Sequence, residues 1–245
     1  MRPSPSDTDP RPPGDFASLL ATSEPMLLVG GQAVNLWALY YGARTESLGP
    51  FVSRDVDVLG DRGTLEALAK LAGTKPQFFP LKPPSNEVGV VIAKDLAGLP
   101  LLIEVLRFVH GVSNHELRNP IYTVAVGKTE VNLPGPIALL QAKIANLADL
   151  AQVGRQDARH VMILAKLLPA YLGDLQTAAK EGRMSERKLI DFLERLLAVI
   201  TTKKVTTVLR QLRLDTFSFF AELGDPQLPK LQAFLGKRLQ RKPRS

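Results

Sequence analysis

The stretch Met26-Leu27-Leu28-Val29-Gly30-Gly31-Gln32-Ala33 indicates a strand, then a glycine turn, then the start of a helix. A second strand follows at Ser53-Arg54-Asp55-Val56-Asp57-Val58 and carries two carboxylates two residues apart. Side chains at i and i+2 of a strand project to the same face, so we expect Asp55 and Asp57 to point together while the two valines pack into the core. Two hard oxygen ligands held side by side suit Mg²⁺ or Mn²⁺.

The glycine turn and the carboxylate pair serve one kind of chemistry. Transfer of a phosphoryl or nucleotidyl group needs a polyphosphate held by backbone N–H groups and a divalent ion that neutralises the charge developing on its oxygens. Gly30 and Gly31 would let the backbone approach the phosphates, and the helix N-terminus after them favours an anion. The alternative is a tight turn followed by a solvated acidic strand end, because each motif alone occurs in many folds.

A third carboxylate, Glu104, lies inside the apolar run from Leu101 to Leu106. Glutamate is almost never buried without a partner, so a lone one in a central strand requires an explanation. A metal ion already held by the two aspartates would supply that partner. The alternative is a pairing with Arg107 or another cation at a sheet edge. Arg54, directly before Asp55, should point away from the aspartates by strand alternation.

Length and composition are those of an ordinary globular protein. The chain has 245 residues, of which 45% are hydrophobic, enough for one large or two small domains with a sizeable core. It has no cysteine, which excludes disulfides, thiolate zinc sites and cysteine nucleophiles. Because the sequence shows neither a charged-then-apolar leader nor an apolar run of membrane length, we expect a cytoplasmic protein that does not enter a membrane.

The net charge of +7 is divided unevenly along the chain. Residues 1–135 carry 12 Lys and Arg against 14 Asp and Glu, a net of −2, whereas residues 136–245 carry 19 against 10, a net of +9. The basic half is where a polyanion would bind. The alternative is that its basic residues only solvate the surface of helices.

The apolar pattern predicts an α+β fold, with a mixed β-sheet flanked by helices and then an all-helical module. Residues 1–14 are rich in proline and should form a disordered leader. We expect a first domain at 15–135, a helical domain at 136–236 and a basic tail at 237–245. Strands are predicted at 26–29, 55–58, 77–81, 88–94, 99–108, 121–126 and 129–133, with a hairpin turn at 95–98. Helices are predicted at 15–22, 32–41, 64–72 with Thr64 as a possible N-cap, 137–151, 157–172, 185–201, 205–212 and 229–239, with turns at Gly173, Gly182 and Gly224.

The order of these motifs resembles the DNA polymerase β-like nucleotidyltransferase superfamily, and most closely the AbiEii-type members of abortive-infection and toxin–antitoxin systems. Those members continue with a helix that bears a lysine and with an arginine–aspartate step that opens the next helix. Here the continuation is Leu139-Leu140-Gln141-Ala142-Lys143-Ile144-Ala145, then Arg155-Gln156-Asp157-Ala158-Arg159-His160. The resemblance covers about residues 27–168. It departs at the turn, where many members have Gly-Ser and this chain has Gly30-Gly31.

The resemblance implies an enzyme that moves a nucleoside monophosphate from an NTP to an acceptor and releases pyrophosphate. The roles it implies are metal binding by Asp55, Asp57 and Glu104, phosphate contacts by Gly30, Gly31 and Lys143, and, for Asp157, orientation of the lysine or a part near the reacting centre. The basic half favours RNA, particularly tRNA, as the acceptor, with a protein hydroxyl or a small molecule as alternatives. A cognate antitoxin protein would be a further partner. The competing hypothesis is a non-catalytic nucleotidyltransferase-like module that binds a protein or nucleic acid.

Two polar side chains of the helical part are further candidates for the same cleft. Lys143 is the cation of an otherwise apolar helix face, as expected for a point charge aimed at phosphate. The alternative is a surface lysine that snorkels to solvent. His160 lies one helical turn after Asp157 and would face the same cleft as that aspartate.

Overall fold

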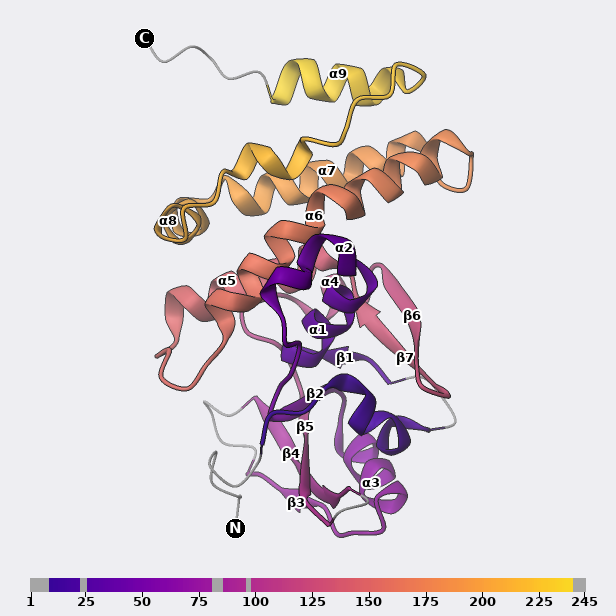
Figure 1. The fold of residues 1–245 in the computed structure, drawn as a ribbon, viewed down its shortest axis with the longest axis vertical. Helices are drawn as coiled ribbons and strands as arrows, with labels where there is room; N and C mark the ends of the chain where they lie inside the picture. Colours follow the sequence, from indigo (N-terminus) through magenta and orange to yellow (C-terminus); the bar gives the residue numbers. More distant parts are fainter. Residues whose placement is uncertain (1–8, 23–25, 81–85, 96–97, 240–245) are drawn as a thin grey trace.

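The computed structural model describes residues 9–22, 26–80, 86–95 and 98–239. Figure 1 shows the five-stranded sheet and helix α3 (Arg62–Leu71) at one end of the molecule, and helices α7 (Glu186–Ile200), α8 (Lys203–Gln211) and α9 (Pro229–Arg238) at the other. Between them lie α5 (Pro136–Asp149) and α6 (Asp157–Lys180). The predicted α+β fold, with strands first and helices after, is confirmed.

The main sheet has the strand order β1-β2-β5-β4-β3. Its members are β1 (Leu28–Val29), β2 (Asp55–Leu59), β3 (Gln77–Phe78), β4 (Glu87–Lys94) and β5 (Pro100–Leu106). Strands β2 and β5 run parallel, and every other neighbouring pair is antiparallel. The expected hairpin is β4 with β5, and the central strands β2 and β5 bury their valines completely. The sheet therefore holds β2, which carries the aspartates, between β1 and β5.

Strands β6 (Ile121–Val126) and β7 (Thr129–Pro134) pair with each other and form a separate two-stranded antiparallel hairpin. An isolated parallel bridge between Leu27 and Asn132 joins it to the edge of β1. The short helices of this half are α1 (Gly30–Tyr40), α2 (Gly42–Thr45) and α4 (Asn114–Leu117), with 3₁₀ turns η1 (Pro13–Leu20) and η2 (Glu46–Leu48). The N-cap predicted at Thr64 is wrong, because Asp61 caps α3 and the Thr64 hydroxyl closes the capping box from the third position.

One helix of the helical half, α6, is longer than the sequence predicts. Helix α6 continues through Pro169 and Gly173 to Lys180, so the turn expected at Gly173 does not exist. Leu172 and Leu175 on either side are buried, and tertiary packing of this face outweighs the weak helix propensity of glycine. A 3₁₀ turn, η3 (Thr216–Phe220), precedes α9. No helix among the described residues is both long and apolar enough to span a membrane.

The two ends of the fold differ from the sequence-based boundaries. Arg11 exchanges backbone hydrogen bonds with Ser53, and Pro13 opens η1, so ordered structure begins before Asp15. At the other end α9 includes Lys237 and Arg238, the first residues of the expected basic tail. Residues 1–8 and 240–245 lie outside the described part of the chain, as do residues 96–97 of the β4–β5 turn and Leu81 of the predicted extended segment.

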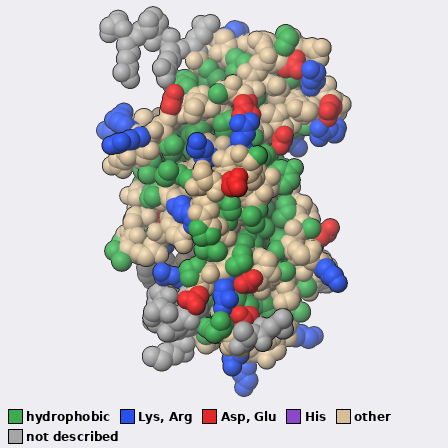
Figure 2. Space-filling model, viewed as in Figure 1, with side chains coloured by type: hydrophobic (Ala, Val, Ile, Leu, Met, Phe, Trp, Pro, Cys, Tyr) green, Lys and Arg blue, Asp and Glu red, His purple; other side chains and the backbone are tan. Residues whose placement is uncertain are grey.

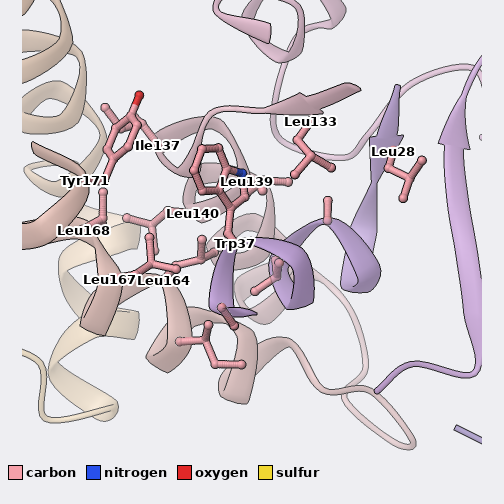
Figure 3. Close-up of a cluster of buried hydrophobic side chains, with 14 of the residues drawn as sticks. Leu28, Trp37, Leu133, Ile137, Leu139, Leu140, Leu164, Leu167, Leu168 and Tyr171 are labelled. Carbon is pink, nitrogen blue, oxygen red and sulfur yellow. The ribbon is translucent and has the colours of Figure 1, made fainter. Parts of the chain in front are cut away.

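The hydrophobic core is continuous across the two halves. Figure 3 shows Trp37 of α1 beside leucines of α5 and α6, with Leu28 and Leu133 on the sheet side. The indole Nε1 donates a hydrogen bond to the Pro134 carbonyl at 2.9 Å, and the Tyr122 and Tyr171 rings meet its edge. Helices α1, α5 and α6 therefore pack against one another. This packing holds the glycine turn beside the sheet, and it holds α5, which carries Lys143, beside the glycine turn.

Surface charge in the helical half is mixed in sign. Figure 2 shows Lys and Arg side chains interspersed with Asp and Glu over one face of the molecule. Several basic residues are neutralised locally, as in Lys180 with Asp225 and Arg238 with Glu194. The positive net charge of residues 136–245 is therefore not a single cationic surface on this face.

Candidate active site

Three carboxylates of the central strands face the same side of the sheet. In the parallel β2–β5 pair, Asp57 is in register with Glu104, and Asp55 with Leu102. Residues in register on neighbouring strands share a face, and Asp55 lies two residues before Asp57. The intervening Val56 is fully buried on the other side, as alternation predicted.

The glycine turn lies directly on one of these carboxylates. Helix α1 begins at Gly30, which has a positive φ of 66°, and a Cβ at this position would lie 1.8 Å from Asp57 Oδ2. A Cβ on Gly31 would lie 2.9 Å from Ser53 Oγ and 3.2 Å from His160 Cε1. The positive φ and the 1.8 Å approach require glycine at position 30, whereas a side chain at position 31 would need Ser53 and His160 to shift. Ser53 and His160 thus flank the place where a serine side chain of the Gly-Ser motif would project.

A buried ion cluster stands on the helical side of the site. Asp157 opens α6 and is 2% exposed. Its Oδ1 accepts hydrogen bonds from Lys143 Nζ at 3.0 Å and from Asn146 Nδ2 at 3.4 Å, and its Oδ2 accepts one from Arg155 Nε at 2.6 Å. The side chain of Lys143 is 8% exposed, which excludes the snorkelling alternative. The contact expected between Lys143 and Asp157 is therefore present.

One cavity of about 650 Å³ brings these groups together. It is lined by all the residues that the sequence singled out: Gly30, Gly31, Asp55, Asp57, Glu104, Lys143 and Asp157. Arg54 also lines it. The hydrogen bond from Ser53 Oγ to Asp55 Oδ1 places Ser53 on the side of the aspartates, so the opposite direction expected for Arg54 between them stays a prediction.

Negative charge is in excess around Asp57. Burial raises the pKa of this carboxyl well above its usual range, and the charges of Asp55 and Glu104 raise it further, while Lys143 and Arg155 act in the opposite direction. Asp55 itself accepts a hydrogen bond from Ser53 Oγ at 3.1 Å. Arg107, the cation considered as a partner of Glu104, donates a hydrogen bond to the Glu87 carbonyl. A bound cation would relieve this repulsion.

The oxygens of this wall are the ligand type that Mg²⁺ and Mn²⁺ prefer. Within the described residues, however, no three His, Asp or Glu side chains are placed to hold a metal ion as they stand. The donor set fits a divalent cation by its chemistry and its excess charge, and binding would require the carboxylates to converge.

His160 is a polar side chain of the cavity with no hydrogen bond. It is 4% exposed, and neither ring nitrogen has a partner among the described residues. Burial lowers its pKa to about 3, with the charge of Lys143 acting in the same direction. The imidazole is therefore neutral at pH 7.

Three lining residues had only weak signals in the sequence. Ser53 lies two residues before Asp55, and Asn146 lies three residues after Lys143 on the same helix face. Arg155 was part of the quoted motif but had no assigned role. Strand and helix periodicity could have suggested all three, but only the fold shows that they share a cavity.

Comparisons with known proteins add distant structural likenesses only. No family model matches the chain, and no curated protein matches its sequence. An antigenic nucleotidyltransferase-like protein from Paracoccidioides brasiliensis is similar over 81% of this chain and 100% of its own, at 16% identity and a TM-score of 0.41. JHP933 from Helicobacter pylori is similar over 93% of this chain and 94% of its own, at 18% identity and a TM-score of 0.42. At this identity and TM-score neither likeness assigns an activity to this chain.

The repulsion at Asp57 predicts a stability effect. In metal-free buffer Asp57→Asn should unfold at a higher temperature than wild type, because the amide removes a charge that burial and two neighbouring carboxylates disfavour. The pKa of Asp57 is raised in the folded state, so the gain should be absent at low pH, grow as the pH rises above the usual pKa of aspartate, and be complete above the raised pKa. Melting curves at several pH values measure it, with exposed Glu130→Gln as the control. A variant less stable than wild type at pH 8 would contradict the charge assignment.

The neutral imidazole predicts a second pH dependence, of opposite sign. With a pKa of about 3 in the folded state and a usual value near 6.5, His160 binds fewer protons folded than unfolded between these limits, so it lowers stability as the pH falls. Relative to His160→Leu, wild type should lose about 2 kcal/mol of unfolding free energy between pH 7 and pH 5. Urea unfolding at both pH values measures this difference. A difference that does not change with pH would show that the ring protonates freely in the folded protein.

Proposed function

We propose that this protein is a metal-dependent nucleotidyltransferase that moves a nucleoside monophosphate from an NTP to an acceptor. One observation supports this most directly: the glycine turn at the start of α1 lies on the Asp57 carboxylate, in the same cavity as Asp55, Glu104 and Lys143. These groups complement a triphosphate bound together with a divalent cation. The cation would bind the carboxylates, and the phosphates would bind the backbone N–H groups and the lysine.

The proposed roles follow from the donors available. Asp55, Asp57 and Glu104 would hold Mg²⁺ or Mn²⁺, which when bound neutralises charge on the phosphate oxygens. Gly30 and Gly31 would offer the backbone N–H groups of the α1 N-terminus. The three carboxylates lie on the neighbouring strands β2 and β5, whose valines are packed in the core, as a preorganised site requires.

Lys143 would act as the cation on the phosphates. An ammonium group has three donors, and Asp157 accepts one of them, so the lysine can be held by the aspartate and still bind an anion. The reaction would break the bond between the α-phosphorus and the oxygen bridging to the β-phosphorus, and form one to an acceptor hydroxyl oxygen, with pyrophosphate as the leaving group.

We propose RNA as the acceptor, with α8 as part of its binding surface. Lys203 and Arg210 lie seven residues apart on the exposed side of α8, and neither forms an ion pair with any described residue. The neighbouring Lys204 pairs with Asp149, which also accepts a hydrogen bond from the cavity residue His110. A polyanion reaching into the cavity would therefore pass α8. A role as the toxin of a toxin–antitoxin or phage-defence system, with a cognate antitoxin protein, belongs to the same proposal.

The catalytic proposal predicts label transfer that depends on Asp57. Incubation with each α-labelled NTP, Mg²⁺ or Mn²⁺ and total cellular RNA or lysate should label an acceptor, and Asp57→Asn should reduce the rate by about 10²-fold or more. Lys143→Met should weaken NTP binding, and it should also lower the melting temperature because Asp157 loses a buried partner. Glu130→Gln is the matched control. Should Asp57→Asn label as fast as wild type, or neither protein label anything, the non-catalytic binding module becomes the better description.

The RNA proposal predicts a salt-dependent affinity that involves α8. Each phosphate neutralised releases counterions, so the log–log slope of affinity against salt should be roughly −0.7 to −0.9 per contact. Lys203→Glu with Arg210→Glu should reduce RNA binding and RNA labelling but leave NTP binding unchanged. The control is Lys70→Glu with Lys75→Glu, which changes the net charge equally on the sheet half. Affinity that is flat with salt, or label found only on protein or small molecules, would reject RNA and leave the transferase assignment intact.

A further inference from the structure

His160 is an unexplained polar group at the glycine turn. Its side chain comes from the first turn of α6, three residues after Asp157, and lines the cavity. It is 4% exposed, yet neither ring nitrogen has a hydrogen-bond partner among the described residues. A buried donor or acceptor left unpaired costs free energy, so such a group in a native protein requires an explanation.

The position of the ring points to the start of α1. A Cβ built on Gly31 would lie 3.2 Å from His160 Cε1, so the imidazole stands against the backbone of this residue. The N-cap residue of α1 is Val29, whose apolar side chain cannot cap the helix, and the first N–H groups of a helix have no acceptor within it. The ring nitrogens, which have no partner among the described residues, and the N–H groups at the start of α1 therefore lie together at one wall of the cavity.

The protonation state limits what the ring can do. Burial and the nearby Lys143 keep the imidazole neutral, with a pKa of about 3. A group with this pKa is a poor general base near pH 7 and is not a cation that attracts phosphate over a distance. A neutral imidazole still has one N–H donor and one nitrogen acceptor. Its remaining function is a directed, short-range hydrogen bond.

We propose that His160 is a substrate-binding residue that donates a ring N–H hydrogen bond to a phosphate oxygen of the nucleotide held at the Gly30–Gly31 turn. This inference rests on the proposed function and extends it to a residue that the motif did not assign. An anion at an uncapped helix N-terminus is favoured by the helix dipole, and its oxygens are the acceptors that both the backbone N–H groups and the imidazole N–H lack.

The test compares two ligands and two substitutions. His160→Leu removes both hydrogen-bonding atoms at similar volume, and His160→Gln keeps a donor and an acceptor on a flexible side chain. Binding of an NTP and of inorganic tripolyphosphate, each with Mg²⁺, is measured by calorimetry, and folding of each variant by its melting temperature. His115→Phe, at an exposed position outside the cavity lining, is the control for loss of a histidine.

Loss of one hydrogen bond to a charged acceptor should weaken binding of both ligands by about tenfold or more in His160→Leu. The melting temperature of this variant should stay equal to that of wild type or rise, because an unpaired buried polar group is removed. His160→Gln should recover part of the affinity. A structural role alone would give the reverse result, with a lower melting temperature and unchanged affinity.

Three other outcomes would overturn the proposal. Equal affinity of wild type and His160→Leu for both ligands would reject His160 while the proposed function stands. A loss for the NTP but not for tripolyphosphate would place the contact on the nucleoside and reject the phosphate assignment. Wild type that binds neither ligand would reject this inference and the proposed function together.

Discussion

The contact between Gly30 and Asp57 is the constraint around which the site is built. Pairing of Val29 with Asp57 in the β1–β2 ladder brings the end of β1 beside the carboxylate, and the chain must turn there to begin α1. The turn has a positive φ and no room for a Cβ, so a glycine is required. The same contact places the N-terminus of α1 at the carboxylates, where a cation and a polyanion would complement each other.

The helical half completes the site through one buried aspartate. Asp157 is bonded to Lys143 and Asn146 of α5 and to Arg155 just before α6, so it connects two helices at the cavity wall. Removing one partner of such a cluster leaves buried charge uncompensated. The cluster thereby fixes the lysine near the carboxylates, and the aromatic packing around Trp37 holds both helices against α1.

Much of this arrangement follows from local patterns. The strands at 121–126 and 129–133 were predicted within one residue, and the start of the helix at Asp157 was predicted correctly, because period-two and helical spacing report directly on which face is buried. The failures have equally local causes. Thr64 was expected as the cap of α3, where Asp61 is the N-cap, and Gly173 was expected to form a turn, although packing of a buried helix face continues α6 through it.

Local spacing in the chain predicted the carboxylate pair and the glycine turn, because each depends on residues a few positions apart, and the resemblance to a known superfamily implied the roles of the lysine and the aspartate of the helices. Only the tertiary structure decided that Glu104 is in register with Asp57, that Ser53 and His160 flank Gly31, and that Arg54 and Arg155 line the same cavity. These relations join β2 to β5 and α1 to α6, segments far apart in the sequence. Register and packing between such segments depend on how the whole core is filled, which no local spacing encodes.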